Sequence, residues 1–367
     1  MLNRILFFFV IATGFLAFQR SWLALASLAV VVSFGYEEFT RTKIRRLHRN
    51  KTIGKLKSRL PSLPYSEAEF NKQFLAVMGS QSKRSTRFFR KENISSSLIN
   101  YIDGVRKTSF VQSHQSKGPK IRLFGGSTID CQEVPDDFTI ASQLQKRVNG
   151  ISSFLNGYEV INYGVSGATL NANYDHFGQI EISKGDICIF FFGANETTFP
   201  SDFFKTKPFI SFIPKLRQAI DLLERVQFVT LYRLLRKFMT FDQNHPLLKN
   251  KVEDISRILS LINSRCQSRG THLAVILQPL LHTRVPFTQY DFPNLYLFPK
   301  TNFEAPLFLF EKLENVLKVQ EFFFDGRCIF NQSDLDVYLD WVHTNHQGNK
   351  IIADYFYSII QQNFLKS

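Results

Sequence analysis

Short apolar runs alternate with amphipathic stretches from about Lys120 to the C-terminus. Helical patterns such as Ile140–Val148 and Val252–Arg265 separate these runs. The runs that have the length of strands and a turn signal after them are Ile121–Phe124, Val160–Tyr163, Ile187–Phe192, Leu273–Leu277 and Glu321–Phe324. The alternation predicts an α/β domain over residues 120–367, a three-layer doubly wound fold with a five-stranded parallel sheet.

Phenylalanine is unusually frequent in this pattern. The chain holds 39 Phe residues, and several stand in runs such as Phe190–Phe192 and Phe322–Phe324. Consecutive large apolar side chains point to both faces of a strand. We therefore expect these strands to be buried on both faces, as in a parallel sheet covered by helices.

The first 38 residues contain two uncharged apolar runs, Ile5–Gln19 and Ser21–Tyr36, with Arg20 between them. Each run is slightly shorter than the about 20 residues of a membrane span, but flanking residues can extend it and arginine can snorkel. A helical hairpin, one long helix with a buried Arg20, and a signal peptide are the alternatives. The second run directly after the first argues against a signal peptide, and we expect a membrane anchor, with the hairpin favoured.

A basic stem follows the anchor. The chain has a net charge of +14, and the block between Phe39 and Leu60 holds nine Lys or Arg and no acid. Beside a membrane span, such a block favours contact with anionic lipid headgroups and a cytoplasmic location of the domain at residues 120–367; a domain facing outside is the alternative. There is no zinc-finger spacing or RNP motif, so we expect no nucleic-acid partner. Residues 39–119 are interpreted as this stem and a connector.

The cysteines and one inserted segment also bear on the organisation of the chain. The cysteines Cys131, Cys188, Cys266 and Cys328 form no CxxC pair, so a zinc site or a redox pair is not expected, and Cys188 is predicted to be a small buried hydrophobe. Residues 199–248 are an insertion whose stretch Ile213–Phe238 is amphipathic and basic. It is interpreted as a cap over the site, a membrane-surface helix or an ordinary peripheral helix pair.

The first chemical motif is Gly125-Gly126-Ser127, directly after the first predicted strand. Ligands of open α/β sheets bind at the carboxyl ends of the strands. Two glycines permit a sharp turn, and a serine there begins the next helix, where backbone amides favour negative charge. The motif fits a nucleophile, or a plain glycine turn with Ser127 as a helix cap.

Two further motifs follow the second and third strands. Gly167 lies in a loop with few bulky side chains, and Asn195 follows Phe190–Phe192 closely. A side-chain amide in this place can donate to an oxyanion. Each motif alone is also compatible with an ordinary loop or a turn asparagine.

The last motif places Asp340 three residues before His343, which puts both on one side of a turn. A carboxylate there can orient an imidazole base. A capping Asp beside an exposed His is the plain alternative. A metal site from Asp340, His343 and His346 is conceivable, but it accounts for neither Ser127 nor Asn195.

In their order, these motifs resemble those of the SGNH hydrolase superfamily, the GDSL lipase/esterase family, over residues 120–364. Gly125-Gly126-Ser127 resembles its first block, with Gly126 in place of the usual Asp. Gly167 and Asn195 match the second and third blocks. Asp340 and His343 match the last block, in which Thr344 stands where the family often has Pro.

The resemblance implies a flavodoxin-like fold and a serine mechanism that needs no cofactor and no metal. It implies that Ser127 attacks an ester carbonyl, that His343 is the base and that Asp340 orients it. The amides of Ser127 and Gly167 and the Asn195 side chain would form the oxyanion hole.

Two classes of function follow. The first is a membrane-tethered serine esterase that hydrolyses or transfers an acyl group, with O-acetyl as a candidate, on an envelope polysaccharide or a lipid. The second is a catalytically silent SGNH-like module that binds glycans or scaffolds a membrane complex. A complete triad with an oxyanion donor favours the enzyme, because a binding module has no need of them.

Overall fold

The computed structural model describes residues 70, 72–74, 82–84, 89–91, 93–150, 157–197, 204–206, 239–291 and 304–364. The sheet and the candidate site belong to one compact unit, Pro64–Thr198 with Gln243–Ser367. In the other unit, the described strands are β8 (Phe204–Thr206) and β9 (Met239–Phe241), an antiparallel pair. The two predicted apolar membrane runs, the basic block and the stretch 213–238 lie outside the described residues.

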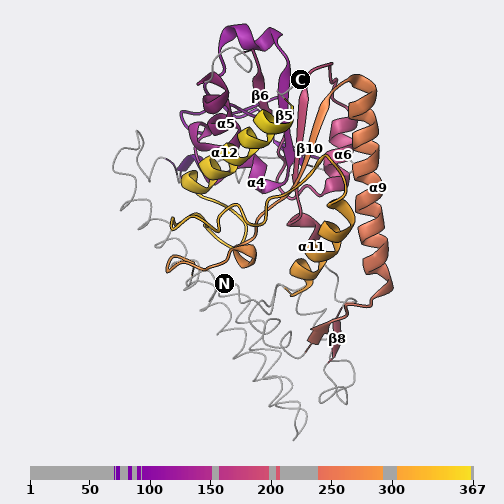
Figure 1. Cartoon of the computed structure of the whole chain (residues 1–367). Coiled ribbons are helices and arrows are strands. Elements are labelled where there is room, and N and C mark those ends of the chain that lie inside the picture. The colour runs from indigo at the N-terminus through magenta and orange to yellow at the C-terminus, as the bar shows by residue number, and fades with distance from the viewer. Residues whose placement is uncertain are drawn as a thin grey trace, which may run out of the picture. The chain divides into compact units, whose positions relative to one another are not determined.

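A seven-stranded sheet forms the centre of the larger unit, in the order β11-β10-β7-β5-β6-β4-β3 (Figure 1). The five strands from β6 to β11 are parallel to one another, and the order of these five is that of a flavodoxin-like sheet. Their bounds are β5 Lys120–Gly125, β6 Glu159–Asn162, β7 Ile187–Phe192, β10 His272–Leu277 and β11 Phe323–Asp325. The five predicted parallel strands and the doubly wound fold are confirmed.

The sheet is nevertheless mixed and larger than predicted, because β3 (Tyr101–Ile102) and β4 (Val105–Arg106) extend it in antiparallel fashion. Asp103 and Gly104 join them with φ angles of 51° and 76°. The expectation of five strands was wrong because strands of two residues show no periodicity. The Asp-Gly pair, a common hairpin turn, was the available signal. Nearby, β1 (Ser82–Arg84) and β2 (Phe89–Lys91) form a separate antiparallel pair.

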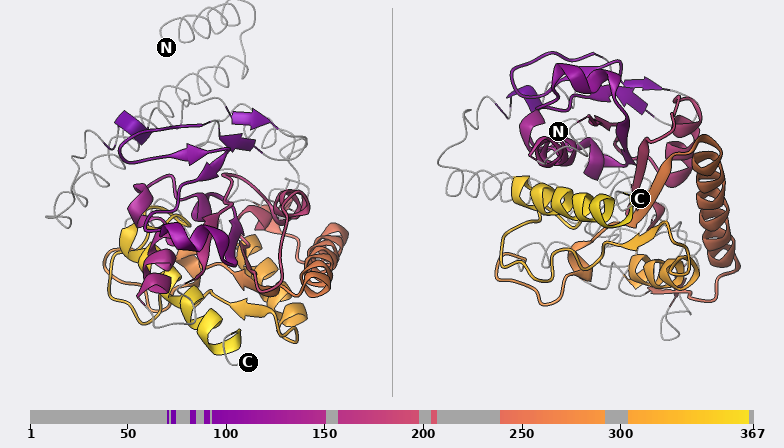
Figure 2. Two further views of the ribbon diagram at one scale, coloured as in Figure 1. Left: turned by 90° about the horizontal axis from the view of Figure 1, so that it is seen from above. Right: turned by 45° about the horizontal axis from the view of Figure 1, so that its top comes forward.

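Helices cover both faces of the sheet. On one face lie α5 (Ile140–Asn149) and α12 (His346–Asn363), packed against each other (Figures 1 and 2). On the other face lie α6 (Leu170–Gly178), α9 (Pro246–Arg269) and α11 (Glu304–Leu317). The short helices of this unit are α4 Ser127–Asp130, η1 Ser113–Lys117, η2 Asp136–Phe138, η3 Asn195–Thr197 and η6 Leu281–Thr283.

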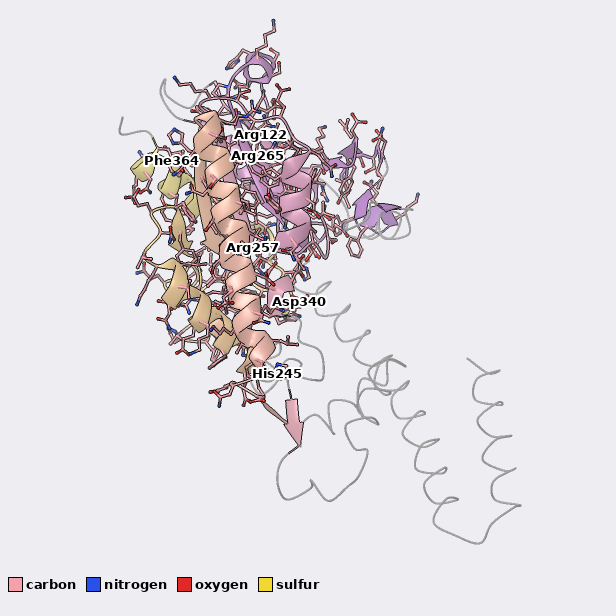
Figure 3. All side chains as sticks on the ribbon, turned by 90° about the vertical axis from the view of Figure 1, so that its right-hand side faces the viewer. Arg122, His245, Arg257, Arg265, Asp340 and Phe364 are labelled. Carbon is pink, nitrogen blue, oxygen red and sulfur yellow. The ribbon has the colours of Figure 1, made fainter. Side chains whose placement is uncertain are left out.

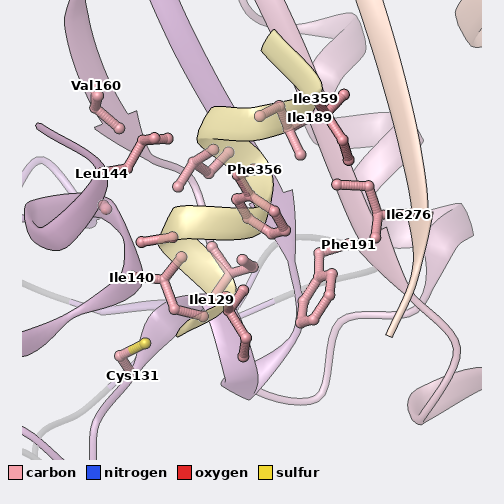
Figure 4. Packing of buried hydrophobic residues seen from close by; sticks show 14 of the residues in the cluster. Ile129, Cys131, Ile140, Leu144, Val160, Ile189, Phe191, Ile276, Phe356 and Ile359 are labelled. Atoms are coloured by element: carbon pink, nitrogen blue, oxygen red, sulfur yellow. The ribbon is translucent and has the colours of Figure 1, made fainter. Parts of the chain in front are cut away.

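The phenylalanine run of β7 is buried on both faces, as predicted. The ring of Phe191 lies 5.3 Å from that of Phe356 in α12, within the cluster that Figure 4 shows. The ring of Phe190 points the other way, 4.7 Å from Phe124 and 5.4 Å from Phe177 of α6. Each such side chain contributes about 1.5–3 kcal/mol to stability by its burial.

At the amino ends of the strands, a buried ion pair holds the sheet together. Asp186, just before β7, binds the Arg122 guanidinium at 2.9 Å and accepts the Lys120 amide at 2.7 Å. Figure 3 shows Arg122 and Asp340 far apart along the strands. The candidate site residues follow the opposite, carboxyl ends of the strands.

The cysteine side chains and the described helices bear on two further expectations from the sequence. Cys131, Cys188 and Cys266 are buried free thiols, so the prediction for Cys188 is confirmed, and Cys328 is free and exposed. Within the described ranges, no helix combines the length and the apolar character that crossing a bilayer requires.

Candidate active site

Ser127 lies at the turn between β5 and α4. Gly125 ends the strand, Gly126 caps the helix, and Ser127 is its first residue. A Cβ atom at Gly126 would lie 2.3 Å from Nδ2 of Asn195, so only glycine fits there while Asn195 keeps its place. A larger residue at position 126 would therefore have to displace the Asn195 amide.

The structure brings Ser127, His343 and Asp340 together. His343 Nε2 lies 2.7 Å from Ser127 Oγ, and His343 Nδ1 lies 2.7 Å from Asp340 Oδ2. In the neutral imidazole, this arrangement assigns the Nδ1 proton to the bond with Asp340, so that Nε2 accepts from the serine hydroxyl. Ser127 and His343 are 216 positions apart in the chain, and they meet at the carboxyl ends of the strands.

The loop that contains Asp340 fixes the Asp340 carboxylate with its own backbone amides. Asp340 Oδ1 accepts the backbone amides of Val342 at 2.8 Å and His343 at 2.7 Å, which leaves Oδ2 for the imidazole. Burial alone would raise the pKa of Asp340, but its hydrogen bond to His343, the imidazolium charge and the two amides outweigh burial and lower it. These contacts favour the ionised form of Asp340 and place its Oδ2 against His343 Nδ1.

The residues after His343 fix the loop to α12. Thr344 donates its hydroxyl to Asn349 Oδ1 at 2.6 Å, and the Asn349 amide donates to the Phe138 carbonyl at 3.0 Å. Thr344 thus links the loop of His343 to α12 through hydrogen bonds. The ring of His346 packs edge-on against Phe138 at 5.9 Å, and burial lowers its pKa. Over the described ranges, no three His, Cys, Asp or Glu side chains group as metal ligands.

Three polar donors were expected from the sequence to act together with Ser127: the amides of Ser127 and Gly167 and the Asn195 side chain. In the described part of the chain, the backbone amides of Ser127 and Gly167 make no hydrogen bond, and Gly167 has a φ of 77° that favours glycine. Asn195 Nδ2 donates to the Ala168 carbonyl at 2.7 Å, and within the described ranges its second hydrogen has no acceptor. These are the groups that the family resemblance places in the oxyanion hole.

Glu196 was not predicted, and it joins the two loops that carry these donors. Its Oε1 accepts the Leu170 amide at 2.5 Å and its Oε2 accepts the Gly193 amide at 2.7 Å. The residue is buried, which raises its pKa, while both amides act in the opposite direction. The sequence showed an acid directly after Asn195, but nothing that indicated its backbone partners.

Asn162, the last residue of β6, makes a second tie. Its Nδ2 donates to the Ile129 carbonyl of α4 at 2.8 Å, and its Oδ1 accepts the Gly164 amide at 2.9 Å. The side chain is fully buried. It therefore holds α4 against the loop that leads to Gly167.

Glu133 is a second acid beside the imidazole that the sequence did not indicate. Its Oε1 lies 3.7 Å from His343 Nε2, and burial raises its pKa. Burial alone would lower the pKa of His343, but the hydrogen bond to Asp340 and the charges of Glu133 and Asp340 raise it to about 9.

Comparisons with known proteins identify a family for the chain. The family model for GDSL-like lipase/acylhydrolase matches residues 121–356. Curated proteins gave no match. Similar solved structures are an acetyl xylan esterase (14% identity, 66% of this chain and 99% of that chain, TM-score 0.38), a lipolytic G-D-S-L protein from Veillonella parvula (14%, 67% and 100%, 0.37) and an acetylxylan esterase from Geobacillus stearothermophilus (16%, 68% and 97%, 0.38).

Proposed function

The chain belongs to the GDSL-like lipase/acylhydrolase family and is an ester hydrolase, and we propose that Ser127 is its nucleophile and His343 its general base. One observation carries the assignment: two hydrogen bonds of 2.7 Å join Ser127 Oγ, the His343 imidazole and the Asp340 carboxylate in a continuous chain. A serine hydroxyl is a weak nucleophile until an adjacent base takes its proton. His343 Nε2 is in position to do so.

The reaction follows from this geometry. As Ser127 Oγ attacks the ester carbonyl, His343 Nε2 takes the hydroxyl proton, and Asp340 stabilises the imidazolium. His343 then gives that proton to the leaving alcohol, so an acyl-serine remains. A water molecule attacks the acyl-serine with His343 again as base, which releases the acid and restores Ser127.

The negatively charged oxygen of each tetrahedral intermediate needs hydrogen-bond donors, which must lie away from His343. We assign this role to the backbone amides of Ser127 and Gly167 and to the second amide hydrogen of Asn195. Support comes from the two amides that have no partner in the described part of the chain and from the close fit of Asn195 to Gly126.

For the substrate, we propose an acyl ester of a saccharide or a lipid, with O-acetyl as the first candidate. A screen of short-chain, long-chain and O-acetylated sugar esters tests this, with Ser127→Ala as the control. Addition of a saccharide acceptor separates transfer from hydrolysis, since transfer yields an acylated acceptor. A wild-type protein no faster than Ser127→Ala on every ester would contradict the assignment.

For location, we propose a membrane-tethered enzyme with a cytoplasmic catalytic domain. The proposal is supported by the two apolar runs, Ile5–Gln19 and Ser21–Tyr36, and by the acid-free basic block after them. A reporter fused to the C-terminus tests it. Green fluorescence is the expected result, and alkaline phosphatase activity would place the domain outside.

A further inference from the structure

Glu133 lies beside the nitrogen of His343 that faces Ser127. It belongs to the loop between α4 and η2, and its Oε1 is 3.7 Å from His343 Nε2, the same nitrogen that meets Ser127 Oγ. The Glu133 side chain is 27% exposed. It is therefore both next to the reacting nitrogen and open to a ligand.

The neighbouring acids do not bind the Glu133 carboxylate, which remains available to interact with a substrate. Asp340 lies at the other nitrogen of the imidazole, and the nearby Asp130 carboxylate is already engaged by the Tyr101 hydroxyl at 2.6 Å and the Gln132 amide at 2.5 Å. Among the described residues, His343 alone forms an ion pair with Glu133, and no Lys or Arg does. Within the described part of the chain, the charged group that Glu133 faces is therefore the His343 imidazole itself.

The distance to the substrate follows from the mechanism. To protonate the leaving alcohol, Nε2 must come within about 3 Å of its oxygen. Because Glu133 Oε1 is 3.7 Å from Nε2, it lies within roughly 7 Å of the leaving oxygen in any productive complex. That range covers the first few atoms of the alcohol portion.

We propose that Glu133 is a specificity-determining residue, which favours esters whose alcohol carries a hydroxyl group or a positive charge near the scissile oxygen and rejects anionic alcohols. An ionised carboxylate only accepts hydrogen bonds, and like charges placed close together in a partly desolvated site repel strongly. The inference rests on the proposed function, since it assigns the leaving-group side of the same site.

Three matched pairs of acetate esters test it on the full-length protein, with release of acetic acid followed by titration at constant alkaline pH. The first pair, 2-hydroxyethyl acetate and propyl acetate, differs by a hydroxyl group. The second, acetylcholine and 3,3-dimethylbutyl acetate, differs by a positive charge. The third, 4-acetoxybenzoate and 4-acetoxybenzamide, differs by a negative charge. The measured quantity is the ratio of kcat/KM within each pair.

The wild-type protein should prefer the hydroxyl and the cationic ester and disfavour the anionic ester, each by about tenfold. In Glu133→Gln, both charge-dependent ratios should approach one, and the hydroxyl ratio should fall less because glutamine still accepts a hydrogen bond. Glu133→Asp should restore part of each preference. Asp137→Asn removes the same charge from an exposed residue of η2 and should leave all three ratios unchanged.

Unchanged ratios in Glu133→Gln would overturn the inference, as would equal changes in Asp137→Asn. Ratios are internal to each variant, so a general loss of rate does not imitate the effect. A wild-type protein that hydrolyses none of the six esters faster than Ser127→Ala would instead overturn the proposed function, and the inference with it.

Discussion

The two sides of the candidate active site are assembled in different ways. On the base side, Asp340 and His343 are three residues apart and share one loop, whose own amides hold the carboxylate. On the oxyanion side, Ser127, Gly167 and Asn195 come from three loops that follow three strands, and buried side chains of other residues tie these loops together.

The difference indicates which substitutions should disturb each side of the site. The Asp340 carboxylate and the His343 imidazole are held mainly by contacts within one loop, so we expect the loss of a reacting group to have the largest effect on the base side. The oxyanion side depends on long-range buried hydrogen bonds, and losing one acceptor leaves a buried donor unpaired. Substitutions that never touch substrate should therefore disturb the oxyanion side more than the base side.

The largest expected effect is on the base side. His343→Ala should lower kcat for ester hydrolysis by about 10⁴-fold, because no other group takes the serine proton. His346→Ala, three residues further along, should change it little, since the His346 ring packs against Phe138. Steady-state kinetics on one ester compare the two variants, and similar losses in both would mean that His346 takes part in the chemistry.

On the oxyanion side, Asn195→Ala should lower kcat by roughly 10²–10³-fold with little change in KM, because the donor acts mainly in the transition state. Thr197→Ala, in the same short helix, provides a comparison variant. A loss confined to KM would instead make Asn195 a residue that binds the ground state of the substrate.

A smaller loss should follow from crowding the same donor. In Gly126→Ala, the new Cβ would lie 2.3 Å from Asn195 Nδ2 and push the amide away, so we expect kcat to fall by about 10–100-fold. The effect should be almost absent in the Asn195→Ala background, where the clash no longer exists. Full additivity of the two losses would show that Gly126 matters for another reason.

Glu196→Gln tests the tie between the loops without touching substrate. Glutamine offers one acceptor oxygen to the two amides of Leu170 and Gly193, so kcat should fall by about tenfold while KM changes little. Glu159→Gln removes a partly exposed acid elsewhere on the sheet and serves as the control. Equal losses of kcat in Glu196→Gln and Glu159→Gln would mean that Glu196 does not support the oxyanion side.

The smallest effect should be a displacement of the pH profile. Since the pKa of His343 is raised to about 9, kcat/KM should rise with pH through about 9 as the imidazole becomes neutral. Glu133→Gln removes a charge that favours the imidazolium, so this rise should move to lower pH. An unmoved rise would mean that Glu133 does not act on His343.

The same pKa shift has a consequence for folding. The folded-state pKa of about 9 exceeds the ordinary value of 6.5, so the contribution of His343 to stability is complete below pH 6.5 and is lost as the pH rises through about 9. Thermal unfolding at several pH values should show this loss in the wild type and a smaller one in Glu133→Gln.

Features that rest on local sequence patterns could be predicted, and features that rest on distant residues could not. The five parallel strands have clear apolar runs, and the Asp340–His343 spacing is local, so both could be predicted. Strands β3 and β4 are too short to show a pattern. Glu133 meets His343, which is far away in the chain, and Glu196 joins the nearby Gly193 amide to the distant Leu170 amide. The sequence shows no pattern that indicates the distant partners. The fit of Gly126 to Asn195 depends likewise on two distant loops.

Labelling with a fluorophosphonate, followed by peptide mapping, tests the central claim most directly. An activated serine should form one phosphonyl adduct on the peptide that contains Ser127. Ser127→Ala should not be labelled, and His343→Ala should be labelled far more slowly, because the base is missing. An adduct on a different serine, or equal labelling of Ser127→Ala and the wild type, would contradict the assignment of Ser127 as nucleophile.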